Sequence, residues 1–256
     1  LRGIVLTGFP WNLIAYSWSW SIESLQILSI IGVYSFSLIS LIFFCSPFLF
    51  LKRTNVRKNI IFILILLTLF IGNYFYGLNK INSTNYSFDN NVTIKIIAPS
   101  FTLDDYKSNG DELQLEQLIK ISDPQKEKKT IFIWPEGILY ESYLQNISQY
   151  EPIFSNKFSE NHLIVLGATD SRNDIYFNSL AILNNKLEIV SQYNKINLVP
   201  FGEFLPFEFF LSKLGLKKIT HGYSAFSPGN DRLIINLSDK FNRKTILPLI
   251  CYEIIY

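Results

Sequence analysis

The chain has 256 residues, of which 48% are hydrophobic, 16% are aromatic and only 17% are charged. Soluble domains usually carry about a quarter of charged residues, so this composition, with a mean hydropathy of +0.20, favours a membrane-associated protein with a folded part attached. The formal net charge of +2 and the lack of a basic stripe in the sequence argue against a nucleic-acid partner.

Methionine is absent, even at position 1, so we expect a fragment or a processed piece of a longer protein. The first twenty residues lack the ordered basic, apolar and cleavage regions of a secretory signal peptide.

One cysteine, Cys45, lies in an apolar run and the other, Cys251, near the end, which argues against a disulfide framework. The histidines His162 and His221 stand in no zinc-binding pattern, so we expect no metal and no cofactor.

Residues 1–78 are predicted to form a membrane region. Two runs without charged residues, 24–51 and 60–78, are each long enough to cross a bilayer, which takes about 20 apolar residues. The alternative, two buried helices of a soluble protein, is disfavoured by the length of these runs. A short loop between them carries four basic residues, which predicts that it stays on the cytoplasmic side: Lys52, Arg53, Arg57 and Lys58. The residues after Leu78 would then lie on the outer face, which is the periplasm in a Gram-negative bacterium.

The opening segment "LTGFPWNLIAYSWSW" is apolar and aromatic but is broken by Gly8 and Pro10. Its tryptophans, Trp11, Trp18 and Trp20, suit the interface between a membrane and water, where an amphipathic ring has one wet and one apolar side. A role in contacting substrate is the alternative, and the sequence does not separate the two.

After a linker at 79–91, which is rich in Asn and Ser, the pattern changes to short strands alternating with helical stretches. Residues 111–122 have a loosely helical apolar spacing. The segments "FNSLAIL" and "LEIVSQY" read as a strand pair joined by an Asn-Asn turn. Further strands are predicted in "VTIKIIA", "TIFIWP", "HLIVLGAT", "RLIINL" and "TILPLI". Residues 92–256 are therefore predicted to form an α/β domain.

Three polar residues follow apolar strands of this domain, namely Glu136, Lys195 and Cys251. A cysteine attacks as its thiolate, so it needs a base, a cation that holds negative charge, or both. Neither histidine stands in a convincing motif, so a partly shielded carboxylate, Glu136, is the candidate base. Lys195 is a candidate for stabilising an oxyanion. Each residue also has an ordinary interpretation: a solvated loop glutamate, a surface lysine and a buried structural thiol.

Taken together, the three positions predict a site, because the carboxyl ends of parallel strands meet at one edge of a sheet. Their order, Glu then Lys then Cys, resembles the carbon–nitrogen hydrolase (nitrilase) superfamily. The motifs "WPEG", "KINLVPFGEFLPFE" and "ICYE", with "LTGFPWN" near the start, resemble the apolipoprotein N-acyltransferase branch. The lysine motif is the most specific of these, and the resemblance covers nearly the whole chain.

The resemblance implies a nitrilase-like αββα sandwich, cut short at its C-terminal end and preceded by transmembrane helices. It implies that Glu136 is the general base, Lys195 the oxyanion stabiliser and Cys251 the nucleophile. Glu203 and Glu253 match two further glutamates that the family requires. Tyr252, beside the nucleophile, and the motif residue Trp134 are expected to support the pocket or bind substrate.

The family also implies partners and a location. These are a phospholipid acyl donor, a diacylglyceryl-modified apolipoprotein acceptor, and a bacterial inner (plasma) membrane crossed several times, with the catalytic domain facing the periplasm. We expect a monomer. The chain departs from the family at "APSFTLDDYK", where Tyr106 and Lys107 stand and the usual tryptophan is missing. The stretch "FGEFLPFEFF" would line an entrance for acyl chains, with core packing of Phe204, Phe207, Phe209 and Phe210 as the alternative.

The predicted reaction passes an acyl group from the phospholipid to Cys251 and then to the amine of the lipoprotein's N-terminal cysteine. Two other functions remain open from the sequence. One is a membrane-tethered amidase or nitrilase that passes the acyl group to water. The other is a membrane-anchored domain that only binds ligands.

Overall fold

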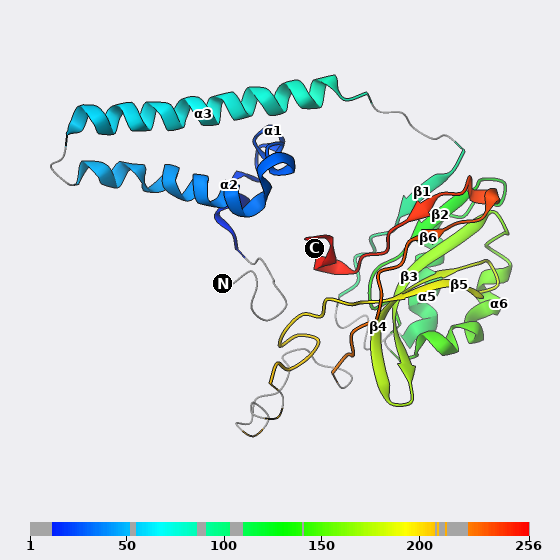
Figure 1. Ribbon diagram of the computed structural model, residues 1–256. Helices are drawn as coiled ribbons and strands as arrows, with labels where there is room; N and C mark the ends of the chain where they lie inside the picture. Colours follow the sequence, from blue (N-terminus) through cyan, green and yellow to red (C-terminus); the bar gives the residue numbers. More distant parts are fainter. Residues whose placement is uncertain are drawn as a thin grey trace. The chain divides into compact units, whose positions relative to one another are not determined.

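The computed structural model describes residues 12–51, 55–85, 91–102, 110–139, 141–207, 209, 213 and 225–255. The chain divides into two compact units, Leu1–Phe88 and Asp89–Tyr256, which are considered one at a time (Figure 1). Several sequence features lie outside the described residues: the segment "LTGFPW" with Trp11, the basic residues Lys52 and Arg53, and His221.

The first unit is helical. Its elements are η1 (Ile14–Trp18), α1 (Ile22–Leu25), α2 (Leu28–Cys45), η2 (Ser46–Phe50) and α3 (Val56–Ser83). The segments Leu28–Phe50 and Val56–Ser83 are long and apolar enough to cross a membrane. These helices differ from the predicted apolar runs in two ways. Helix α3 continues through residues 79–83, which the sequence assigned to the linker, and α2 is interrupted at Gly32, whose φ is 74°.

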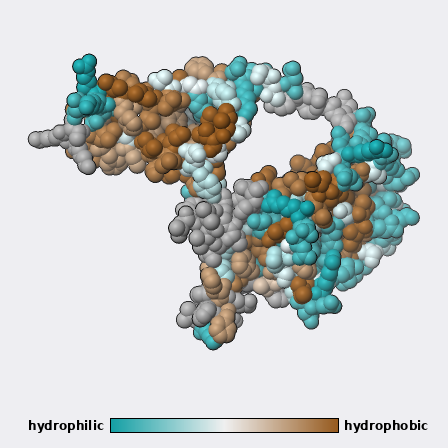
Figure 2. Space-filling view, viewed as in Figure 1, coloured by the Kyte–Doolittle hydropathy of each residue, from teal (hydrophilic) through white to brown (hydrophobic). Residues whose placement is uncertain are grey.

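Close packing at two points holds these helices together. A Cβ at Gly77 of α3 would lie 1.9 Å from the carbonyl oxygen of Glu23, so only glycine permits this approach to α1. The ring of Trp18 stacks on Phe70 with centroids 4.7 Å apart, and its Nε1 donates to Ser40 Oγ. Trp18 is therefore a packing residue of this unit, whereas Trp20 is exposed. Figure 2 shows apolar side chains over the outer surface of α2 and α3, as expected for helices that face lipid.

The second unit contains a five-stranded sheet in the order β1-β2-β3-β4-β5 and a two-stranded sheet, β6-β7. Its elements are β1 (Thr93–Ile96), α5 (Gly110–Ser122), β2 (Thr130–Ile133), η3 (Leu144–Tyr150), α6 (Glu151–Ser155), β3 (His162–Arg172), β4 (Ile175–Leu183), β5 (Ile189–Asn194), β6 (Ile235–Asn236), η5 (Asp239–Phe241), β7 (Thr245–Ile246) and η6 (Cys251–Ile255). The predicted α/β class and the apolar helices that precede it are confirmed.

Turn residues set the strand directions. Asn173 and Asp174, between β3 and β4, both have left-handed φ angles, 49° and 61°, as a tight hairpin requires. Asn184 Oδ1 accepts hydrogen bonds from the amides of Lys186 and Glu188, which closes the predicted Asn-Asn turn. Strands β1, β2 and β3 are parallel, and two antiparallel steps follow. β5 therefore runs in the direction of β2, and both strands end at the same edge of the sheet.

Each face of the large sheet carries its own core. On one face, helical residues pack against the strands, including Leu115, Leu118, Leu144, Ile147 and Phe154. On the other face, Ile131, Leu163, Val165 and Ile182 pack against Ile235, Leu237 and Phe241 around the two-stranded sheet. Helices, large sheet and small sheet thus form three successive layers, in the order predicted for an αββα sandwich.

The last two predicted strands are much shorter than expected. Only two residues of "RLIINL" are in β6, and only two of "TILPLI" are in β7. Pro248 has no amide hydrogen to give to a ladder, which explains why β7 stops before it. Cys251 therefore does not extend directly from a strand of the large sheet.

Candidate active site

Glu136 lies in a tight loop that follows β2. Gly137 has a φ of 66°, a left-handed conformation that suits glycine. The loop is bound to β3 at Gly167, whose amide donates to the carbonyl of Pro135 and whose carbonyl accepts from Ile138. A Cβ at Gly167 would lie 2.6 Å from the Cα of Glu136, so the absence of a side chain permits this contact. Glu136 is exposed as a residue, and its carboxylate is shielded in part where Oε1 accepts a hydrogen bond from Asn178.

Lys195 follows β5, and its side chain is buried. Its amide donates to the carbonyl of Asn178 across the strand pair, so the two residues lie opposite each other. The lysine is 1% exposed, and its Nζ lies 2.9 Å from Glu203 Oε1 and 5.1 Å from the centre of the Tyr252 ring. A buried ammonium needs such partners because it has lost its water. The surface-lysine interpretation is therefore wrong.

Glu203 holds the lysine from a loop that folds back on itself. Its Oε2 accepts from the amide of Val199 at 2.8 Å, and its own amide donates to the carbonyl of Val199. The other oxygen, Oε1, accepts from Lys195. The eight-residue spacing between Lys195 and Glu203 in the sequence thus corresponds to an ion pair in the structure.

Asn178 joins the two glutamates, and sequence reasoning missed it. Its Nδ2 donates to Glu136 Oε1 at 2.6 Å and to Glu203 Oε1 at 2.7 Å. An amide nitrogen carries two hydrogens, so one side chain can serve both carboxylates. The result is a continuous chain of contacts from Glu136 through Asn178 and Glu203 to Lys195. We call these four residues the polar cluster.

Glu253 connects the segment around Lys195 to the segment around Cys251. Its carboxylate is fully buried. Oε1 accepts from the hydroxyl of Tyr193 and from the amides of Ile196 and Asn197 at 2.9, 2.9 and 3.0 Å. Oε2 accepts from the amide of Ile250 at 2.9 Å. Burial raises the pKa of Tyr193 to about 12, and the neighbouring carboxylate adds to the rise, so the hydroxyl keeps its proton at neutral pH and donates it.

Cys251 lies between residues that are fixed on both sides. Ile250 and Glu253 are joined by the Glu253 carboxylate, and the Tyr252 ring lies near the Lys195 ammonium. Cys251 has a left-handed φ of 55°, an unfavourable conformation for a residue with a side chain. It is exposed, so the alternative of a buried structural thiol is wrong. Among the described residues it makes no hydrogen bond to Glu136 or Lys195.

Other predicted site residues lie elsewhere. Trp134 is 4% exposed in the core on the helical face, and its Nε1 donates to Ser122 Oγ of α5 at 2.9 Å, so its side chain does not contact the polar cluster. Phe207 and Phe209 are 72% and 66% exposed, so the alternative of core packing is wrong for these two residues. Tyr106, Lys107 and Phe210 lie outside the described residues.

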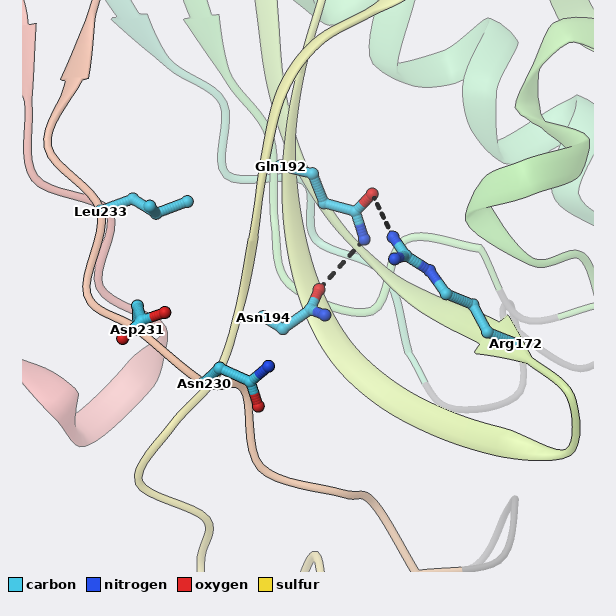
Figure 3. Close-up of a pocket in the computed structure, with 6 residues that line it drawn as sticks. All are labelled: Arg172, Gln192, Asn194, Asn230, Asp231 and Leu233. Atoms are coloured by element: carbon cyan, nitrogen blue, oxygen red, sulfur yellow. Dashed lines mark hydrogen bonds between the residues drawn. The ribbon is translucent and has the colours of Figure 1, made fainter.

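A separate polar pocket lies on the opposite face of β5 (Figure 3). Its volume is about 240 Å³, and it is lined by Arg172, Gln192, Asn194, Asn230, Asp231 and Leu233. Arg172 donates to Gln192 and pairs with the buried Asp170. Side chains alternate between the two faces of a strand, so Gln192 and Asn194 point away from the face that carries Tyr193 and Lys195. This pocket is therefore distinct from the polar cluster.

The arrangement has the parts of nucleophilic catalysis at a carbonyl group. It provides an exposed thiol, an exposed carboxylate able to take a proton, and a buried ammonium able to stabilise negative charge. An ammonium has three donors, and among the described residues Lys195 commits one, to Glu203. Donors thus remain for an oxyanion.

Comparisons with known proteins agree with the motifs. Residues 1–46 match the family model described as "Apolipoprotein N-acyltransferase N-terminal domain". Proteins named apolipoprotein N-acyltransferase are similar over the whole chain: 28% identity to that of Brucella suis over 269 residues, 27% to that of Rhodopseudomonas palustris over 274, and 29% to that of Rickettsia typhi over 266. These alignments cover 49%, 50% and 51% of the relatives, so the chain spans about half their length.

Among solved structures, the NitN amidase from Neterenkonia sp. AN1 matches with 14% identity and a TM-score of 0.37, over 62% of this chain and 56% of that one. A carbon–nitrogen hydrolase from Helicobacter pylori matches with 14% identity and a TM-score of 0.28, over 54% of this chain and 45% of that one. The sequence matches confirm the resemblance that the motifs predicted: along its whole length, this chain is similar to the apolipoprotein N-acyltransferases.

Proposed function

We propose that this chain carries the catalytic centre of an apolipoprotein N-acyltransferase. The observation that carries the proposal is the buried ion pair of Lys195 and Glu203, linked by Asn178 to Glu136. Keeping a lysine 1% exposed is costly unless the charge is paired. A surface that only binds ligands has no need for a buried cation that is linked through Glu203 and Asn178 to the carboxylate of Glu136.

In the first step, Glu136 takes the thiol proton and the sulfur of Cys251 attacks an ester carbonyl of a phospholipid. The carbon–sulfur bond forms while the carbonyl oxygen takes negative charge, which Lys195 stabilises. The tetrahedral intermediate then breaks its carbon–oxygen ester bond. The proton on Glu136 passes to the departing oxygen, so that a lysophospholipid leaves and a thioester remains on Cys251.

In the second step, the α-amine of the lipoprotein's diacylglyceryl-cysteine attacks the thioester. The carbon–nitrogen bond forms, the carbon–sulfur bond breaks, and Glu136 takes a proton from the amine and returns one to the sulfur. The product is an amide. Two separate half-reactions predict ping-pong kinetics.

The substrates proposed here fit the composition of the chain. Both are anchored in a bilayer, and two helices of this chain are long and apolar enough to cross one. We place the protein in the bacterial inner membrane, crossing it several times, with the catalytic unit on the periplasmic side. The exposed phenylalanines Phe207 and Phe209 are suited to contact acyl chains near the entrance of the site.

A labelled-donor assay tests this function. The full-length protein in phospholipid vesicles receives a phospholipid with a labelled acyl chain and a diacylglyceryl-cysteine peptide with a free amine. We expect label on the peptide amine, a lysophospholipid as co-product, and neither in the Cys251→Ala variant. A peptide with an acetylated amine is the matched control. Label released only as free fatty acid would favour a hydrolase, and wild-type transfer by Cys251→Ala would overturn the proposal.

A further inference from the structure

We propose that Tyr193 is a positioning residue for the nucleophile: through Glu253 it fixes the Cys251 segment relative to Lys195. The expected effect on catalysis rests on the proposed function, but the hydrogen bonds that join Tyr193 to the Cys251 segment do not depend on it. Tyr193 and Lys195 are two residues apart at the end of β5, so both face the same side of the sheet. Tyr193 is 1% exposed and gives its hydroxyl hydrogen to Glu253 Oε1 at 2.9 Å.

The two oxygens of Glu253 bind different segments. Oε1 accepts from Tyr193 and from the amides of Ile196 and Asn197, all of which adjoin Lys195. Oε2 accepts from the amide of Ile250, the residue before Cys251. One carboxylate therefore connects the lysine segment to the nucleophile segment, and we call this set of four hydrogen bonds the Glu253 clasp.

Burial makes each donor of the clasp important. A carboxylate without solvent exposure depends on protein donors in place of water, and hydrogen bonds to a charged oxygen are stronger than those between neutral groups. Tyr193 gives the only side-chain donor of the four bonds. It is therefore the one that a substitution can remove without altering the backbone.

The strained conformation of Cys251 explains why the clasp should matter for catalysis. A left-handed φ of 55° at this residue persists only when the surroundings hold it. The flanking residues Ile250 and Glu253 are the ones that the clasp holds. Loosening the clasp allows the segment to relax, which moves the sulfur away from the place where it meets the substrate carbonyl.

Tyr193→Phe in the full-length protein tests this. Losing one hydrogen bond to a charged group predicts a fall in kcat of about tenfold, with KM for the phospholipid unchanged. Amide hydrogen exchange at Ile250 should also accelerate, about tenfold. In a Glu253→Ala background, which lacks the acceptor of the Tyr193 hydroxyl, Tyr193→Phe should change each quantity less than twofold, because the two residues act as a unit. If Glu253→Ala abolishes turnover, the Ile250 exchange rates in the same two backgrounds decide.

Tyr150→Phe is the matched control, since the Tyr150 hydroxyl bonds Ser142 Oγ at 2.9 Å, away from the clasp. It should leave Ile250 exchange and kcat within twofold of wild type. Wild-type exchange and kcat in Tyr193→Phe would overturn the proposal, as would equal effects of Tyr193→Phe with and without Glu253→Ala. If the wild-type protein forms no acyl adduct on Cys251, the proposed function fails, while the exchange rates still decide whether the clasp exists.

Discussion

The contact between Gly167 and the loop of Glu136 gives the sharpest prediction. In a Gly167→Ala variant, the new Cβ would lie 2.6 Å from the Cα of Glu136 and 3.3 Å from the amide nitrogen of Gly137, whereas ordinary van der Waals contact begins at 3.4 Å. Both neighbouring atoms belong to the backbone, so neither can rotate away. The loop must therefore move by about 0.8 Å, the difference between 3.4 and 2.6 Å.

This displacement sets the expected magnitude. A shift of about 1 Å in a catalytic group can lower a rate by about a hundredfold, so we expect kcat to fall by about ten- to a hundredfold. The overpacking itself costs about 1–3 kcal/mol of unfolding free energy, less than the about 5–15 kcal/mol by which native proteins are usually stable. Because Glu136 accepts a hydrogen bond from Asn178, the same shift would also lengthen the link between Glu136 and Glu203.

The assay is the rate of acyl transfer from a labelled phospholipid to Cys251, with unfolding by denaturant measured alongside. Gly72→Ala is the matched control, since a Cβ at Gly72 would meet no atom within 4 Å. It should leave the rate within twofold of wild type. A folded Gly167→Ala variant with the wild-type rate would refute the reasoning, because it would show that the position of Glu136 does not matter for acylation.

Two further predictions concern the polar cluster and the clasp. Asn178→Ala removes the bridge between Glu136 and Glu203 and should lower kcat by about ten- to a hundredfold with little change in KM. Steady-state kinetics with a short-chain phospholipid measure both constants. A change in KM alone would contradict the prediction. The second uses the pKa of Tyr193, which burial raises from 10.0 to about 12. A raised pKa in the folded state adds stability that is fully present below pH 10 and is lost as the pH rises from 10 to 12. Denaturant unfolding between pH 8 and pH 12 should therefore show a decline that is smaller in Tyr193→Phe, and an identical decline in both proteins would contradict the assignment.

The sequence predicted the class of the fold because its signals are local. Uncharged runs of lipid length predicted the two long helices, and short apolar or alternating runs predicted the strands of the large sheet. The ends of elements were less predictable. Helix α3 continues to Ser83 through residues rich in Asn, because Asn and Ser lower helix propensity by only a fraction of a kcal/mol per residue. The opposite error occurred at "TILPLI", where the apolar run predicted a strand that Pro248 cuts short.

The ends of β2 and β5 were correctly expected to converge, which brings Glu136 and Lys195 to the same edge of the sheet. Asn178 was missed because it lies inside a strand, and nothing in "FNSLAIL" separates it from an ordinary polar position. Its role depends on the register of β4 and β5, which places it opposite Lys195. Tyr193 was missed because its partner, Glu253, is 60 residues away in sequence. Trp134 was assigned to the site because it shares the motif "WPEG" with Glu136, but its side chain lies with Phe132 in the core on the helical face.

The most direct test of the account is mass spectrometry of Cys251 in the full-length protein after incubation with a phospholipid and no acceptor. We predict an acyl group on Cys251 that hydroxylamine removes, as it does from a thioester. In the Lys195→Met variant, which lacks the ammonium, the adduct should form at least a hundredfold more slowly than in the wild-type protein, because the oxyanion loses its stabilising charge. Wild-type protein that stays unmodified at Cys251, or a Lys195→Met variant that acylates at the wild-type rate, would contradict the account.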